Sequence, residues 1–295
     1  MLRNLICIML CMFLALAGCS NTAVENQDTP ASPPPSVTPP STPTPAPTPS
    51  PTPHPVPALF FNNEYIPDSA PIVYNSIQYV PIIKAVQCIL PDASIDQNDE
   101  CIVIETKDLS ATINLWQEYV IANGRYLYNP NGVLFQESAY YLPTSLISAV
   151  LGIKTQNDDA GNVFFLSGGD PLIPGDTFYD ADALFWLSHI INAESGNQPL
   201  RGKIAIGNVV LNRVKHPSFP DSIYDVLFQT GQFYDTYAGA ITKEPNNESI
   251  IAAKLCLDGA VVLPNAYWFN GVGIPCWASS NKTLIAVIGD HAFYG

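Results

Sequence analysis

The sequence predicts a multidomain protein in which an α+β domain with an internal repeat precedes a mainly helical domain. A proline-rich stretch, residues 20–57, separates an apolar N-terminus from the rest of the 295 residues. Between residues 59 and 168, two alternating apolar runs are each followed by a proline and a short helical pattern. From about residue 176 the apolar positions recur at helical spacing instead. We therefore expect four segments, at residues 1–18, 19–58, 59–168 and 176–295.

The N-terminus has the pattern of an export signal. Arg3 is followed by an apolar run, residues 5–17, whose length suits a signal peptide but is short for a membrane-spanning helix. Cys19 comes just after this run, preceded by Leu-Ala-Gly. Small residues before such a cysteine resemble the lipobox of bacterial lipoproteins. This implies that Cys19 is diacylated and anchors the chain to the outer face of the cytoplasmic membrane. The alternative is an ordinary secretory signal with an incidental cysteine.

Composition and charge limit the partners. The formal net charge is −14, which argues against nucleic acid and against attraction to an anionic membrane surface. No other stretch is long and apolar enough to span a bilayer, so we expect the lipid to be the anchor. Residues 20–57 contain half of the 28 prolines. This composition predicts a polyproline II tether that reaches roughly 100 Å if fully extended.

Four cysteines follow the tether, two in each proposed domain. They are Cys88 and Cys101, then Cys256 and Cys276. Export permits a disulfide in each domain, and free buried thiols are the equal alternative. None of the four has the spacing of a zinc finger.

The domain over residues 59–168 repeats one pattern. A Tyr-x-Pro motif ends an alternating run at Pro81 and again at Pro143, and each proline suits the first turn of a short helix. Two such halves resemble the copper amine oxidase N-terminal domain, a stalk-like domain of secreted proteins. Further strands are predicted at residues 102–104, 111–115 and 163–166.

The name of that family does not imply a copper site here. The segment contains no histidine, and its soft ligands are limited to Cys88 and Cys101. We interpret the domain as a spacer or a wall-binding module.

The helical pattern after residue 176 places one carboxylate on an apolar face. Asp180 or Asp182 can cap a helix, and Glu194 lies about 20° from Leu187 and about 40° from Ile190 around its axis. Partial burial and the negative end of the helix dipole are both expected to raise the pKa of Glu194, as a general acid requires. The alternative is a glutamate turned to solvent at a frayed helix end.

A second helix is predicted over residues 200–214, and further motifs follow in a set order. The series is Ala193-Glu194, Asn212-Arg213, Gln232-Phe233, Tyr267-Trp268-Phe269-Asn270 and His291-Ala292-Phe293-Tyr294. This order resembles the SleB-type cell-wall hydrolases, which include spore-cortex-lytic enzymes active in germination. The resemblance implies a lysozyme-like α+β fold and peptidoglycan as the partner, reached by the tether. It also implies one glutamate as acid/base, and we expect no cofactor.

The resemblance assigns roles to particular residues, each with a structural alternative. Glu194 is the catalytic candidate. Substrate contact is implied for Asn212, Arg213, Gln232, Phe233, Tyr267, Trp268 and His291. The amide of Gln232 could bind sugar hydroxyls or an N-acetyl group, and the aromatic rings, including Trp277, could stack on sugars or belong to the core. Asn212 and Arg213 could instead tie helices together, and a structural role is favoured for His291.

The chain departs from the family pattern at two positions. Ser195 stands where arginine is more usual, and Asp290 stands where glycine is common before the histidine. We expect both changes to alter the electrostatics of a cleft around Glu194.

Two other functions compete with cleavage of the glycan strand. A zinc amidase or peptidase acting on the peptide stem needs clustered ligands, whereas His189, His216 and His291 are scattered. A non-catalytic wall-binding lipoprotein is the other alternative.

The product depends on whether a second carboxylate reaches the site. Glycosidases normally use two carboxylates, and candidates for the second are Asp221, Asp225 and Asp235. None of these has an apolar setting like that of Glu194, which favours a lytic transglycosylase over a hydrolase.

Overall fold

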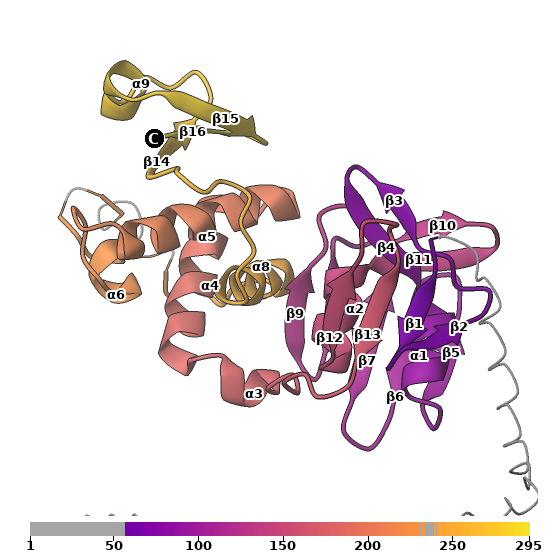
Figure 1. The fold of residues 1–295 in the computed structure, drawn as a ribbon. Helices are drawn as coiled ribbons and strands as arrows, with labels where there is room; N and C mark the ends of the chain where they lie inside the picture. Colours follow the sequence, from indigo (N-terminus) through magenta and orange to yellow (C-terminus); the bar gives the residue numbers. More distant parts are fainter. Residues whose placement is uncertain (1–56, 231, 234–238, 240) are drawn as a thin grey trace, which may run out of the picture. The chain divides into compact units, whose positions relative to one another are not determined.

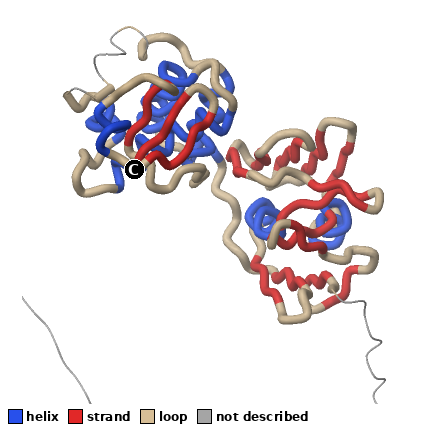
Figure 2. Tube along the Cα trace, turned by 90° about the horizontal axis from the view of Figure 1, so that it is seen from above, coloured by secondary structure: helices blue, strands red, loops and turns tan. Residues whose placement is uncertain are grey.

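The computed structural model describes residues 57–230, 232, 233, 239 and 241–295. The signal peptide, the lipid site at Cys19 and almost all of the tether lie outside the described residues, so those predictions stay predictions. The described chain has a sheet-rich region, residues 59–168, followed by a helical region, residues 176–295 (Figures 1 and 2). In the part of the chain that the structure describes, no helix has the length and apolar character needed to cross a membrane.

The sheet-rich region contains a five-stranded antiparallel meander in which each strand pairs with the next in sequence. Every second residue of β6 and β7 is fully or almost fully buried, as the alternation in the sequence predicts. The meander comprises β5 (Ser94–Gln97), β6 (Cys101–Glu105), β7 (Ser110–Asn114), β8 (Tyr119–Ala122) and β9 (Arg125–Tyr128).

Two four-stranded sheets complete this region, in the orders β12-β13-β1-β2 and β10-β11-β4-β3. β1 and β13 pair in parallel, with Leu59 opposite Val163, so the two ends of the region meet in one sheet. The strands are β1 (Leu59–Phe61), β2 (Glu64–Ile66), β3 (Ile72–Tyr74), β4 (Ile77–Pro81), β10 (Leu134–Gln136), β11 (Ala139–Pro143), β12 (Lys154–Asn157) and β13 (Val163–Leu166).

Both Tyr-x-Pro motifs lie where a strand passes into a helix. Pro81 and Pro143 are the N-caps of α1 (Ile82–Ile89) and α2 (Thr144–Leu151), which confirms both short helices. β4 and β11 pair with each other, so that Pro81 faces Tyr141 and Pro143 faces Tyr79. The two motifs therefore lie side by side in opposite directions.

The hairpins that lead into these helices have the same kind of turn. Two consecutive non-glycine residues have positive φ in each hairpin, at residues 75–76 and at residues 137–138. Paired positive φ values are the geometry of a type I′ turn, whose twist matches that of the flanking strands.

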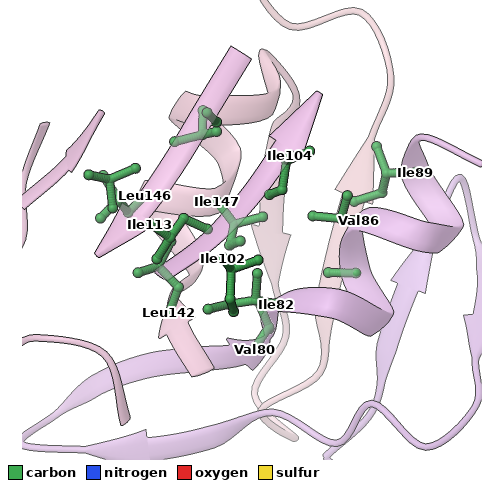
Figure 3. Close-up of a cluster of buried hydrophobic side chains, with 14 of the residues drawn as sticks. Val80, Ile82, Val86, Ile89, Ile102, Ile104, Ile113, Leu142, Leu146 and Ile147 are labelled. Atoms are coloured by element: carbon green, nitrogen blue, oxygen red, sulfur yellow. The ribbon is translucent and has the colours of Figure 1, made fainter. Parts of the chain in front are cut away.

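The core of the sheet-rich region is mainly aliphatic (Figure 3), and it also contains the fully buried ring of Phe165. Side chains from α1 and α2 meet side chains from β4, β6, β7 and β11, and all of them are buried. They include Val80, Ile82, Val86, Ile89, Ile102, Ile104, Ile113, Leu142, Leu146 and Ile147.

Three helices pack on one another in the helical region: α4 (Ala181–Ser195), α5 (Leu200–Lys215) and α8 (Asn247–Leu257). Small residues allow this close packing, as the sequence predicts. A Cβ atom added at Gly207 would lie 2.6 Å from Sγ of Cys256. Shorter helices are α3 (Gly175–Phe178), α6 (Ile223–Leu227) and α9 (Trp277–Asn281).

The C-terminal motifs form a small antiparallel sheet in the order β14-β16-β15 (Figure 2). Its strands are β14 (Trp268–Gly271), β15 (Leu284–Ile288) and β16 (His291–Tyr294). β16 is the central strand, with the ring of Phe293 fully buried, so the His-x-Phe-Tyr motif is part of the scaffold.

A largely buried ion pair joins β9 to the end of α8 within one compact unit. Arg125 donates from Nε and Nη2 to the carboxylate of Asp258, at 2.6 Å and 2.7 Å. The hydroxyl of Tyr179 donates to the same carboxylate at 3.0 Å and accepts the N–H of Tyr126. Both charged groups are thus satisfied by hydrogen bonds, as buried charges must be.

All four cysteines after the tether are free thiols in the structure. Cys256 is buried, and this burial raises the pKa of its thiol. The alternative of free buried thiols therefore holds for Cys256 alone of these four, since Cys101 and Cys276 are partly buried and Cys88 is exposed.

Candidate active site

Glu194 lies on the last turn of α4, beyond the apolar stripe of that helix. Asp180 is the N-cap and accepts the N–H of Ala183, which confirms one of the two predicted caps. Leu187 and Ile190 are fully buried, whereas Glu194 is partly buried and lines a cavity of about 470 Å³. The carboxylate therefore combines a fixed helical position with access to a ligand-sized space.

Side-chain amides hold the turn that follows Glu194. Oδ1 of Asn192 accepts the N–H of Asn246 at 3.0 Å and the hydroxyl of Ser249 at 3.3 Å. Nδ2 of Asn246 donates to the carbonyl of Gly196 at 2.9 Å. Because Asn246 is also the N-cap of α8, this second helix fixes the end of α4 and the position of the glutamate on it.

A buried lysine stabilises the connection between α4 and α5. Lys203 is 1% exposed, and its Nζ donates to the carbonyl of Gln198 and to Oε2 of Glu248, at 2.7 Å in both cases. The side chain of Glu248 is 69% exposed, so the ion pair joins a buried cation to a solvated carboxylate.

The two positions that depart from the family pattern have local partners. Ser195 is fully buried and donates its hydroxyl to the carbonyl of Ile191 at 2.7 Å. Asp290 exchanges two hydrogen bonds of 2.9 Å with the side chain of Gln198. Neither residue is among those that line the cavity, so their effect on its electrostatics stays a prediction.

The cavity brings Glu194 together with residues from α5, β14 and α9. Aromatic and amide side chains make up most of its wall. The lining residues are Glu194, Arg213, Gln232, Phe233, Trp268, Phe269, Asn270, Cys276, Trp277 and Ala278.

Arg213 is the cation of this wall. It is 3% exposed, and its Nε donates to the carbonyl of Tyr267 at 2.7 Å. The guanidinium carbon lies 4.9 Å from the ring centre of Phe233 and 5.1 Å from that of Phe219. The aromatic rings and the carbonyl hold the guanidinium in one place, so that it can interact with a negative charge on a bound ligand.

The predicted site residues divide into two groups. Arg213, Gln232, Phe233 and Trp268 line the cavity with Glu194, whereas Asn212, Tyr267 and His291 do not.

The residues away from the cavity have structural contacts. Asn212 donates to the carbonyls of Leu263 and Ala266, and the ring of Tyr267 stacks on Phe219 at 5.9 Å. His291 packs edge-on against Phe269, and burial lowers the pKa of its imidazole.

Three wall residues were missed by the sequence reasoning: Asn270, Cys276 and Ala278. Asn270 is the last residue of the motif that begins at Tyr267, so its position carried a signal. Nothing in the sequence pattern indicated Cys276. Burial acts to raise the pKa of this thiol, but hydrogen bonds from Ser279, Ala278 and Asn270 outweigh burial and lower it.

A second carboxylate does not reach the cavity from the described residues. Asp225 accepts the hydroxyl of Ser222 at 2.6 Å at the start of α6, and Asp221 is exposed. Asp235 lies outside the described residues. Among the residues that the structure describes, Glu194 is the one carboxylate in the cavity wall, and there is no cluster of three or more metal-ligating side chains.

Two parts of the chain match known families. Residues 197–294 match the family described as Cell Wall Hydrolase. Residues 60–166 match the copper amine oxidase N-terminal domain. Both resemblances inferred from the motifs are confirmed. The cell wall hydrolase match starts three residues after Glu194, so the role of this glutamate stays a prediction.

Curated relatives carry the name spore cortex-lytic enzyme. The one from Oceanobacillus iheyensis is 28% identical over 147 residues, which cover 48% of this chain and 52% of the relative. The one from Bacillus subtilis is 31% identical over 112 residues, or 36% and 35% of the two chains. The chain thus spans about half or less of the length of these relatives. The solved catalytic domain of the Bacillus cereus SleB protein is 25% identical, covering 44% of this chain and all of its own, with a TM-score of 0.37.

Proposed function

We propose that the helical region is a peptidoglycan-lytic enzyme that cleaves the glycan strand between N-acetylmuramic acid and N-acetylglucosamine, with Glu194 as the acid/base. One observation carries the proposal: Glu194 lines a cavity of about 470 Å³ together with aromatic and amide side chains that suit a sugar. The cell wall hydrolase match and the names of the curated relatives support the same substrate.

The number of carboxylates favours a lytic transglycosylase. Glu194 would protonate the glycosidic oxygen, so that the glucosamine end leaves. The same carboxylate would then take the proton of the muramic acid 6-hydroxyl, whose oxygen bonds to C1 and closes a 1,6-anhydro ring. No water is consumed, and no second carboxylate is needed to activate one.

The other wall residues have roles that follow from their chemistry. The tryptophan rings present flat apolar faces on which a pyranose can stack. Gln232 and Asn270 present amides that can hydrogen-bond an N-acetyl group or sugar hydroxyls. Arg213 would place a fixed positive charge in the wall that it shares with Glu194.

The rest of the chain would deliver this site to the wall. The lipid at Cys19 and the proline-rich tether would hold the enzyme at the outer face of the membrane within reach of peptidoglycan. We further propose that the sheet-rich region arose by an internal duplication. Its two hairpin–helix units share a turn type and pair with each other through β4 and β11. We interpret this region as a stalk or wall-binding module.

Mass spectrometry of fragments released from purified peptidoglycan tests the reaction. A lytic transglycosylase leaves anhydromuramic ends, which are lighter by one water than the ends left by a hydrolase. Hydrolytic ends would refute the transglycosylase step, and fragments cut in the peptide stem would refute glycan cleavage altogether.

A further inference from the structure

Lys282 lies against two tryptophans at the edge of the Glu194 cavity. Its Nζ is 4.3 Å from the ring centre of Trp268 and 5.6 Å from that of Trp277. Both tryptophans line the cavity, and their ring centres are 5.8 Å apart. The ammonium group is therefore held next to the aromatic surface on which a sugar would stack.

The backbone around Lys282 is fixed on the same wall. Its N–H donates to the carbonyl of Ala278, another lining residue, at 2.9 Å. α9, which contains Trp277, begins with a reciprocal pair of hydrogen bonds between Cys276 and Ser279. Trp277 and Lys282 are thus the first residue and the C-cap of the same short helix.

Lys282 has a positive charge and no acidic partner within the described chain. Among the residues that the structure describes, no carboxylate lies within 4.0 Å of its Nζ. This holds although the protein has 26 acidic residues against 12 lysines and arginines. The cation is compensated by aromatic rings, which leaves its charge available to an anionic ligand.

We propose that Lys282 recognises the carboxylates of the peptide stem on muramic acid, so that the cavity selects glycan bearing charged stems. This rests on the proposed function. Of the two sugars at the cleaved bond, N-acetylglucosamine is neutral, whereas muramic acid carries the stem. Stacking on Trp268 and Trp277 is indifferent to that charge, and a neighbouring ammonium distinguishes the two sugars.

Binding to insoluble peptidoglycan, freed of phosphate polymers, separates this proposal from the catalytic one. Sedimentation measures the dissociation constant for two walls: untreated wall, and wall whose stem carboxylates have been converted to methylamides. Lys282→Met keeps the aliphatic stem without the charge, Lys282→Arg keeps the charge, and Lys215→Met removes an exposed lysine from α5 as the matched control.

We expect Lys282→Met to weaken binding to untreated wall about two- to fivefold, the size of one solvated ion pair. It should leave binding to the methylamide wall unchanged, while Lys282→Arg and Lys215→Met behave like the parent. Equal binding of parent and Lys282→Met to untreated wall would overturn the proposal. So would an equal loss on both walls, which would indicate packing alone. Cleavage by the parent, scored on the same walls by mass spectrometry, tests the proposed function separately.

Discussion

The two regions of the molecule bury different kinds of side chain. In the sheet-rich region the buried side chains are mainly aliphatic, with a few aromatic rings and few polar side chains among them. The helical region buries two cations and several amides and hydroxyls around its own apolar core. The buried polar residues are Ser69, Asn129 and Thr144 in the first region, and Ser188, His189, Ser195, Gln198, Lys203, Asn208, Arg213 and Ser249 in the second.

The difference follows from where backbone groups find partners. The backbone N–H and C=O groups of paired strands hydrogen-bond to one another. The interior of the sheet-rich region can therefore consist mainly of apolar side chains. The helical region must hold a turn directly after its catalytic candidate, and the carbonyls of that turn are satisfied by Asn246 and Lys203. Variants should therefore act on stability alone in the first region, and on stability and catalysis together in the second.

The largest effect is expected from Glu194→Gln. Glutamine keeps the shape but cannot cycle a proton, so the rate of wall cleavage should fall at least about a hundredfold while the fold is kept. Turbidity of a peptidoglycan suspension measures the rate, and circular dichroism checks the fold. Asp221→Asn, which changes an exposed carboxylate outside the cavity, should keep nearly full activity. Near-normal lysis by folded Glu194→Gln would exclude this glutamate as the acid.

Truncation of the sheet-rich core should cost stability without touching the chemistry. Ile104 is fully buried on β6, so Ile104→Ala should lower the free energy of unfolding by about 3 kcal/mol. Denaturant titration measures this loss. Val103→Ala, on the opposite face of the same strand, should cost much less because that side chain is only partly buried. Activity at low temperature should stay unchanged in both, and a selective loss in Ile104→Ala would show that this region takes part in the site.

Lys203→Met should affect stability and activity together. Its Nζ satisfies the carbonyl of Gln198 from a buried position, so its loss should cost about 2 kcal/mol and loosen the turn after Glu194. Glu248→Gln is the matched variant. It removes the charge of a largely exposed partner and should cost less than about 1 kcal/mol. Equal costs would mean that the ion pair, not the buried carbonyl contact, stabilises the turn.

Asn246→Ala should cost about 1 kcal/mol, since it removes the N-cap of α8. Asn246→Asp keeps the cap acceptor but loses the donor to the carbonyl of Gly196. Compared with Asn246→Ala, the aspartate variant should therefore have a free energy of unfolding close to that of the parent, but a kcat that stays below the parent value. A parent-like kcat as well as parent-like stability would mean that this donor does not position the glutamate.

The smallest effect concerns pH. Burial lowers the pKa of His291 in the folded state, so below about pH 6.5 the unfolded chain takes up a proton that the folded chain resists. Protonation of this residue in the unfolded chain therefore lowers the free energy of unfolding as the pH falls from about 7 to 5. His291→Gln should unfold at a temperature that depends less on pH over that range. An identical pH dependence in parent and variant would show that His291 titrates alike in both states.

Local pattern was sufficient for some elements of the fold. Alternation predicted β6, β7 and β13, and the helical stripe predicted α4 with Glu194 on its inner face, because period and capping are properties of neighbouring residues. The order of the motifs also indicated which residues to consider as substrate contacts. The sequence left nine strands of the described chain unassigned, because whether a short segment becomes a strand depends on the strands that pair with it. They are β1, β2, β5, β8, β9 and β12 and the three strands of the last sheet.

Only the tertiary structure decided which motif residues share a wall. Arg213 and Trp268 line the cavity, whereas Asn212 and Tyr267, their immediate neighbours in sequence, have structural contacts. Adjacent residues on a helix or strand point in different directions, and which direction meets a cavity depends on the elements packed opposite. For the same reason the pair of Arg125 and Asp258, separated by 133 residues, could not be predicted from either neighbourhood.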